Sequence, residues 1–256
     1  MRFSAERYTP EAADALGQEV VGLYHRFAYT FAASLIAPGH RVLDVGCGDG
    51  YGSQILHEAG AEYVGIDVDP AAIAHAKERY DGDFRLYDGI ALPEQRFDLM
   101  TCFQVIEHLA EPEGLLEQIA NRGVEAVFTT PNRDVRLRPG ERPWNRFHVR
   151  EYSRAELHDL LARYFPRVTV SFVRAPQEIE ASELSRIARA RRFARLDVFQ
   201  IRYRAPKSVD RFFRARLRPD APQLPPGVSL DSLWLSQEPG LDLLAQAGSD
   251  ESPGGG

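Results

Sequence analysis

Short apolar runs alternate along the chain with segments whose apolar residues recur at helical spacing. The runs have the length and composition of buried strands and cover 42–45, 62–67, 84–87, 97–103, 124–130 and 168–173. The segments between them predict helices over 53–58, 71–80, 112–121 and 153–164, the last with a capping box of Ser153 and Glu156. Strands that alternate with helices at this spacing predict an α/β fold with a parallel sheet and right-handed crossovers.

Residues 1–40 precede the first of these strands and predict a helical cap. Helical patterns cover 12–18 and 20–35, and the second carries an apolar stripe of Leu23, Phe27, Phe31 and Leu35. The cap can pack on the sheet edge, lie as a lid over a ligand site, or do both.

Residues 174–239 predict a basic helical insert that can cover the substrate. Helical patterns cover 178–193 and 208–217, and four prolines and a glycine follow between 219 and 227. Residues 240–247 predict a last strand, and 248–256 a disordered tail rich in serine, proline and glycine. The core of the domain is therefore expected over 41–173.

A glycine-rich loop follows the strand at 42–45 and leads into a helix. Gly46, Gly48, Gly50 and Gly52 stand at every second position, where glycine permits positive φ and close approach of a ligand. A strand, a glycine loop and a helix N-terminus together predict a nucleotide site. The dinucleotide pattern Gly-x-Gly-x-x-Gly fails here, because Tyr51 or Ser53 stands where its last glycine belongs.

Two acidic residues distinguish between the remaining nucleotides. Asp44, two positions before Gly46, would repel a pyrophosphate but suits a ligand with a positively charged amino group, such as the methionine part of S-adenosylmethionine (SAM). Asp67 ends the next strand, where its carboxylate can accept hydrogen bonds from both ribose hydroxyls, at about 1.5–3 kcal/mol each. These acids and glycines together favour SAM as the cofactor.

The successive segments VLDVGCGDG, VGIDVDP, FRLYDGIALP, FDLMTCFQVIEHL and VFTTPN resemble the motifs of class I SAM-dependent methyltransferases over about 41–173. The resemblance implies a Rossmann-like, mostly parallel sheet of seven strands flanked by helices, with the last strand antiparallel. More narrowly, ERYTP, YHRFAY, GDGYGS and NRFHVREYS resemble bacterial methyltransferases associated with glycan or polysaccharide assembly. That narrower resemblance does not supply a substrate.

The resemblance also implies which residues hold the cofactor. The methionine part would be held by Asp44 and by the backbone of Gly46, Cys47 and Gly48, and the ribose by Asp67. The adenine face would pack on Val68, and the adenine amino group would meet Asp88, with Gly89 and Ile90 beside it. The methyl-transfer side would be lined by Phe103 and Gln104. Asp88 can instead be a turn residue before Gly89.

Transfer of a methyl group to a hydroxyl is assisted by a base, and two histidines are candidates. His108 follows the fourth strand, and His148 lies in the long loop 131–152. Each can instead be structural, as a hydrogen-bonded histidine or an ordering residue of the loop.

A metal site is a further alternative at the same place. In ubiquinone-pathway O-methyltransferases and RNA 3′-end methyltransferases, a Glu-x-x-Glu-His element takes part in binding a divalent ion. Here the first position is Gln104. Loss of one carboxylate weakens a site for a hard cation, so no metal is expected.

Charge is distributed unevenly. The chain has a net charge of −6, yet 186–218 carries eleven arginines and one lysine against two aspartates. This segment can be a solvated face or bind a phosphorylated substrate or RNA, although the overall acidity argues against broad affinity for nucleic acid. The two cysteines, Cys47 and Cys102, form no metal or disulfide pattern. Without an apolar span or signal core, we expect a cytoplasmic protein.

The expected function is methyl transfer from SAM to a small-molecule or glycan-type acceptor, at oxygen before nitrogen. The alternatives are an RNA methyltransferase, supported by the basic segment alone, and a non-catalytic SAM-binding regulatory module.

Overall fold

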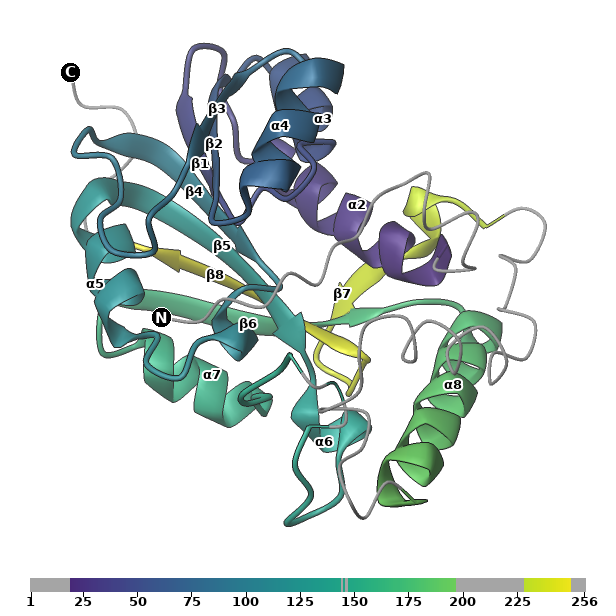
Figure 1. Cartoon of the computed structure of the whole chain (residues 1–256). Coiled ribbons are helices and arrows are strands. Elements are labelled where there is room, and N and C mark those ends of the chain that lie inside the picture. The colour runs from purple at the N-terminus through teal and green to yellow at the C-terminus, as the bar shows by residue number, and fades with distance from the viewer. Residues whose placement is uncertain (1–18, 144, 146, 197–227, 250–256) are drawn as a thin grey trace.

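The computed structural model describes residues 19–143, 145, 147–196 and 228–249 (Figure 1). Its centre is a sheet of eight strands in the order β3-β2-β1-β4-β5-β8-β6-β7. In chain order the strands are β1 (Arg41–Val45), β2 (Glu62–Asp67), β3 (Asp83–Leu86), β4 (Phe97–Phe103), β5 (Gly123–Pro131), β6 (Arg167–Arg174), β7 (Trp234–Ser236) and β8 (Asp242–Gly248). Strands β1 to β5 pair in parallel, whereas β8 lies antiparallel between β5 and β6.

Helices flank this sheet on both faces. Those that pack on it are α2 (Glu19–Ala33), α3 (Gly52–Glu58), α4 (Pro70–Arg79), α5 (Glu113–Arg122) and α7 (Arg154–Leu161). The described residues also form α6 (Arg133–Arg136), α8 (Gln177–Leu196) and single 3₁₀ turns η1 (Ile106–His108) and η2 (Leu230–Ser232). The predicted α/β fold with an antiparallel last strand is therefore confirmed.

The predicted strand count of seven is wrong, because the insert contributes a further strand. In β7, Trp234 lies opposite Arg174 and Ser236 lies opposite Phe172 in an antiparallel pair with β6. A three-residue strand is too short to show a period of two in the sequence, so its pairing partner decides its conformation. The last strand also extends to Gly248, which pairs with Arg167, whereas the disordered tail was expected to begin there.

Several predicted segments lie outside the described residues. These are the helices at 12–18 and 208–217, the proline-rich stretch 219–227 and the end of the tail from 250. The predicted helix at 178–193 corresponds to α8, and that at 20–35 to α2.

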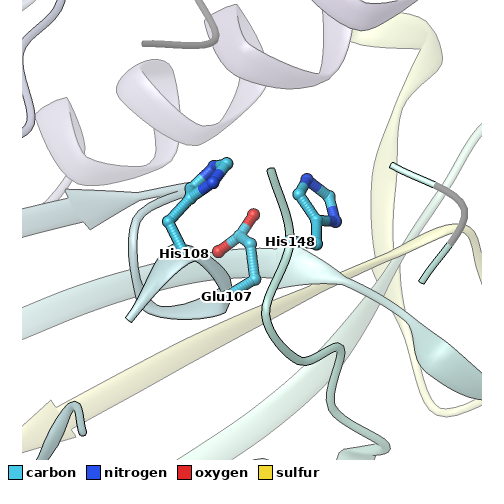
Figure 2. A group of neighbouring side chains, drawn as sticks. All are labelled: Glu107, His108 and His148. Carbon is cyan, nitrogen blue, oxygen red and sulfur yellow. The ribbon is translucent and has the colours of Figure 1, made fainter. Parts of the chain in front are cut away.

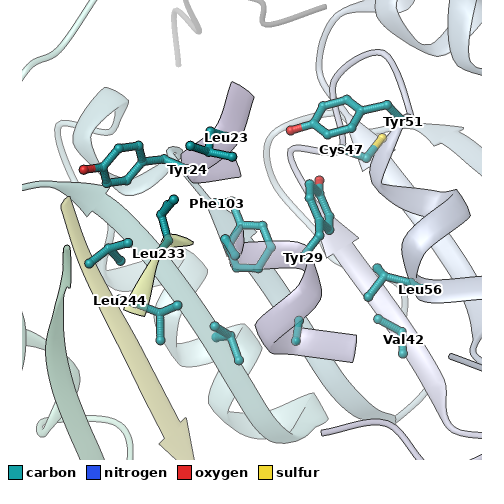
Figure 3. Close-up of a cluster of buried hydrophobic side chains, with 14 of the residues drawn as sticks. Leu23, Tyr24, Tyr29, Val42, Cys47, Tyr51, Leu56, Phe103, Leu233 and Leu244 are labelled. Atoms are coloured by element: carbon teal, nitrogen blue, oxygen red, sulfur yellow. The ribbon is translucent and has the colours of Figure 1, made fainter. Parts of the chain in front are cut away.

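Two apolar clusters hold the layers together, one on each face of the sheet. On one face α2, α3 and α4 pack through residues such as Leu23, Leu56 and Ile73 (Figure 3 shows part of this cluster). On the other face α5 and α7 pack through Leu116 and Leu157, among others. Because β1, β2, β4 and β5 are covered on both faces, their apolar runs are continuous rather than alternating. The edge strand β3 is mostly exposed, and only Phe84 in it is buried.

Within the described part of the chain, none of the helices combines the length and the apolar character that a membrane crossing requires.

Candidate active site

The carboxyl ends of the parallel strands meet at one edge of the sheet, and the predicted site residues gather there. Asp44 lies in β1 and is buried, with 1% of its surface exposed. Its carboxylate accepts hydrogen bonds from three hydroxyls: Tyr29 at 2.9 Å, Tyr63 at 3.0 Å and Thr101 at 2.7 Å. These donors come from α2, β2 and β4, so Asp44 ties three elements together beneath the glycine loop.

Burial dominates the ionisation of Asp44. It raises the pKa of this carboxyl from 3.8 to about 6, although the three hydroxyl donors favour the charged form and oppose the rise. Both carboxylate oxygens are engaged by protein hydroxyls, which fits a role in holding the loop in place. Direct contact between Asp44 and the amino group of a ligand stays a prediction.

Gly46 and Gly48 meet different requirements in the loop. Gly46 has φ of +79°, and a Cβ there would lie 2.5 Å from Val105 Cγ2, so this glycine allows the loop to pack on the segment after β4. Gly48 has φ of +55°, and a Cβ there would meet no atom within 4 Å. The space beside Gly48 is open, as expected for a loop that a ligand approaches closely.

Asp67 ends β2 directly beside this space. Its Oδ2 accepts from the Gly48 N–H at 3.0 Å, and its Oδ1 accepts from the Asp69 N–H at 2.8 Å. The two bonds orient the carboxylate at the loop, and the residue remains partly exposed. Because each carboxylate oxygen has two lone pairs, Asp67 can still accept from the hydroxyls of a ribose. The loop and Asp67 therefore fit SAM.

The residues expected around the adenine lie along the next part of the edge. Asp88 is exposed, and its Oδ1 accepts from the N–H groups of Ile90 at 2.7 Å and Ala91 at 3.1 Å. These bonds lower its carboxyl pKa and show that Asp88 shapes the turn at Gly89, which has φ of +80°. Ile90 is 74% exposed, and Val68 is partly exposed. Their contact with an adenine ring stays a prediction.

Two other predicted residues have side chains in the core. Cys47 is 2% exposed, and burial raises the pKa of its thiol well above the ordinary value, so only its backbone is available to a ligand. Phe103 packs edge to face against Tyr29, with ring centroids 4.9 Å apart (Figure 3). Its place on the methyl-transfer side therefore stays a prediction.

Gln104 stands apart because it has φ of +54°, the only non-glycine residue with positive φ among those described. Its Nε2 donates to Thr129 Oγ1 at 3.4 Å and to Asp242 Oδ2 at 3.3 Å. The Asp242 carboxylate is enclosed although the residue is partly exposed, and burial raises its pKa to about 7 against the opposing charge of Arg136. The Gln104 side chain is thus held toward the start of β8.

The loop after β5 returns to the site and brings the two histidines together. The N–H groups of Val149 and Arg150 donate to the Glu107 carbonyl oxygen at 2.8 and 3.2 Å. The His108 and His148 rings consequently meet at right angles, with centroids 4.9 Å apart. The sequence separates these histidines by forty positions, and the structure places them in one cluster.

Glu107 completes this cluster, and its carboxylate lies beside the two imidazole rings (Figure 2). One ligand-type atom from each of Glu107, His108 and His148 lies within 4.8 Å of the others. Glu107 is fully buried, which raises its pKa well above the ordinary value, and its Oε2 accepts from the Thr130 hydroxyl at 3.2 Å. The arrangement can hold a proton or a cation.

A second ring of contacts orients the histidines. His108 Nδ1 lies 3.0 Å from the Phe147 carbonyl oxygen, and His148 Nδ1 lies 2.8 Å from Glu151 Oε1. Both partners can only accept, so in the neutral rings Nδ1 carries the hydrogen and Nε2 the lone pair. Glu151 is itself buried and paired with Arg136 Nε at 3.4 Å.

Sequence reasoning missed most of these supporting residues. Tyr29, Tyr63 and Thr101 carry no local signal for their contact with Asp44, because they are 15, 19 and 57 positions away. Glu107 directly precedes His108, and Glu151 follows His148 by three positions. Only the docked loop shows that each glutamate is buried beside its histidine.

Comparison with known proteins agrees with this architecture. A family profile for the methyltransferase domain matches residues 17–195, more than half of the chain. A probable SAM-dependent methyltransferase of Mycolicibacterium smegmatis is 34% identical over 146 residues, which cover 54% of each chain. A ubiquinone biosynthesis O-methyltransferase of Hahella chejuensis is 34% identical over 108 residues, covering 38% of this chain and 45% of its own. The chain thus spans about half the length of the curated relatives it matches.

Among solved structures, the YcgJ protein of Bacillus subtilis superposes with a TM-score of 0.51 at 14% identity, covering 89% of this chain and all of that one. This likeness concerns the fold alone. The profile match shows the family, and the glycine loop and Asp67 agree with it: the chain belongs to the class I SAM-dependent methyltransferases, and its cofactor is SAM.

Proposed function

We propose that this protein transfers the methyl group of SAM to a hydroxyl oxygen of a small-molecule or glycan-type acceptor. The observation that carries the proposal is the cluster of Glu107, His108 and His148 at the carboxyl edge of the sheet. It follows β4 directly, whereas the cofactor loop follows the neighbouring strand β1. An acceptor at this edge would therefore have groups beside it that act on a hydroxyl proton.

Groups of this chain at the same edge support a place for the cofactor. The open space at Gly48 would receive the methionine part, and the carboxylate of Asp67 would receive the ribose. The exposed Ile90 offers an apolar surface for the adenine ring. When bound, SAM supplies a methyl carbon attached to a positively charged sulfur, which makes that carbon electrophilic.

The chain's task is then to align and activate the acceptor oxygen. Holding a nucleophile at near-attack distance can contribute about 7–11 kcal/mol to lowering the barrier. A hydroxyl is a poor nucleophile until its proton is removed, and a positioned base contributes roughly 10²–10⁴ in rate. The Nε2 lone pairs of His108 and His148 can accept such a proton or hold a cation. The presence of these two proton acceptors favours a hydroxyl acceptor, because a neutral amine can accept a methyl group without a base.

Calorimetry with SAM tests the cofactor site through a matched pair of glycine variants. In Gly48→Ala the new methyl group enters the open space of the loop, and we expect SAM affinity to fall at least about tenfold. Gly140→Ala is the control, because Gly140 has φ of +79° and also no atom within 4 Å of a Cβ position. It imposes similar backbone strain in the segment after β5 rather than in the glycine loop. Equal SAM affinity in both variants would contradict the proposed site.

The acceptor side is tested separately with His148→Ala and His108→Ala. We expect both to keep SAM affinity while losing methyl transfer, with His158→Ala on the exposed face of α7 as the control. Unchanged transfer in both would remove the two histidines from the mechanism.

A further inference from the structure

The cluster of Glu107, His108 and His148 has the composition and support of a metal site. Glu107 is completely buried, and its Oε1 has no hydrogen-bond partner among the residues that the structure describes. A buried carboxylate oxygen without a partner is costly, and a proton or a bound cation offsets this cost. Two imidazoles that face the same carboxylate supply the remaining ligand atoms.

The contacts behind the histidines favour the same reading. Each Nδ1 is bonded to an oxygen that accepts, the Phe147 carbonyl in one case and the Glu151 carboxylate in the other. This pattern fixes the tautomer in which Nε2 is the ligand atom, as in metal sites where a second oxygen orients each ligating histidine. The His148 side chain is 5% exposed and that of Glu151 is fully buried, so the geometry is rigidly supported.

Gln104 stands where a metal-binding Glu-x-x-Glu-His element has its first carboxylate, but this difference does not exclude a metal site. The missing carboxylate at 104 weakens only a site built on that residue, and the Gln104 amide donates to Thr129 and Asp242. His148 supplies the third ligand in its place, from a loop whose docking on Glu107 the sequence does not reveal.

We propose that Glu107 Oε1, His108 Nε2 and His148 Nε2 bind one divalent transition-metal ion of the Zn²⁺ type. Two imidazole nitrogens and one carboxylate oxygen suit such an ion better than Mg²⁺ or Ca²⁺, which prefer oxygen ligands throughout. Three protein ligands leave a coordination position for an acceptor oxygen. Its role rests on the proposed function: a hydroxyl bound there loses its proton to water more readily, because the cation lowers its pKa.

Cation binding is measured on the tag-free, EDTA-dialysed protein of residues 1–256, without SAM or acceptor. Zn²⁺ is titrated by calorimetry, and Co²⁺ by its visible absorption, which reports the ligand geometry. We expect one equivalent of either ion in the wild type, unaffected by millimolar Mg²⁺. Glu107→Gln, His108→Ala and His148→Ala should each weaken binding at least about tenfold. His158→Ala is the matched control, because His158 is a half-exposed histidine beside Asp159 and a plausible source of surface binding.

SAM calorimetry on the same variants shows whether each is folded. Glu107→Gln keeps the shape of the side chain and an oxygen for Thr130, so it decides the question if an alanine variant fails to fold. No binding in the wild type, binding that survives in Glu107→Gln and the folded histidine variants, or loss in His158→Ala would each overturn the proposal. Because no methyl transfer is measured, its failure is distinguishable from failure of the proposed function.

Discussion

The three hydroxyls around Asp44 allow a quantitative prediction for Tyr29→Phe. The substitution removes only the hydroxyl that donates to Asp44 Oδ2 at 2.9 Å. The ring keeps its edge-to-face contacts with Tyr51 and Phe103, at centroid distances of 5.4 and 4.9 Å. Any loss of stability therefore reports on the bond to the carboxylate rather than on packing.

The expected magnitude follows from the charge of Asp44. A hydrogen bond to an ionised group contributes about 1.5–3 kcal/mol, whereas one between neutral groups contributes about 0.5–1.5 kcal/mol. At pH 8, above the Asp44 pKa of about 6, the acid is ionised, and Tyr29→Phe should lower the free energy of unfolding by about 2 kcal/mol.

The effect should shrink on acidification, and the sign follows from linkage. The pKa of Asp44 in the folded protein is raised above its ordinary value of 3.8, so the folded state binds this proton more tightly than the unfolded state. Folded stability contributed by this group therefore rises as pH falls from above 6 toward 4. Loss of the Tyr29 donor raises the pKa of Asp44 further. The free energy of unfolding of Tyr29→Phe therefore increases more on acidification than that of the wild type. At pH 5 the difference should fall to about 1 kcal/mol.

Urea unfolding followed by circular dichroism at pH 8 and pH 5 measures both values. Tyr24→Phe on the same helix is the control, because the buried Tyr24 hydroxyl has no hydrogen-bond partner among the described residues. Its removal should leave stability unchanged or slightly higher. A loss below about 0.5 kcal/mol for Tyr29→Phe at pH 8, or an equal loss at both pH values, would refute the reasoning.

Two further predictions concern the backbone. Gln104→Gly should be more stable than Gln104→Ala by about 1 kcal/mol in urea unfolding, because φ of +54° is unfavourable for any residue with a Cβ; the reverse order would show that the angle is not strained. Ser153→Ala should lower the free energy of unfolding by about 1 kcal/mol, because Ser153 Oγ accepts from the Glu156 N–H at 3.2 Å in the capping box of α7. Ser185→Ala within α8 is its control and should change stability by less than about 0.5 kcal/mol.

Local signals predicted the parallel half of the fold closely. The predicted bounds 62–67 and 97–103 coincide with those of β2 and β4, because each apolar run is bounded by polar residues or turn formers. The capping box at Ser153 is a contact between neighbours in the chain and was equally visible. The strand β7 could not be predicted from the sequence, because its three residues are extended only through their pairing with β6.

The site divides in the same way. Asp67 and the glycines are recognisable because their roles depend on spacing within one strand–loop–helix unit. The donors to Asp44, the left-handed backbone of Gln104 and the docking of the His148 loop arise from contacts across the sheet. No periodicity or spacing reports such contacts, so the sequence could name His108 and His148 but could not place the Glu107 carboxylate beside both of them.

Transfer of a radiolabelled methyl group tests the central claim most directly. The wild type and Gly48→Ala are incubated with methyl-tritiated SAM and fractionated cell extract, and the labelled product is separated by size and treated with alkali and nuclease. The account predicts label in a low-molecular-weight or oligosaccharide fraction, stable to alkali as a methyl ether is. At a SAM concentration below its Kd, the label should be at least about tenfold lower with Gly48→Ala. No label above the Gly48→Ala background, or label in acid-precipitable material released by nuclease, would contradict it.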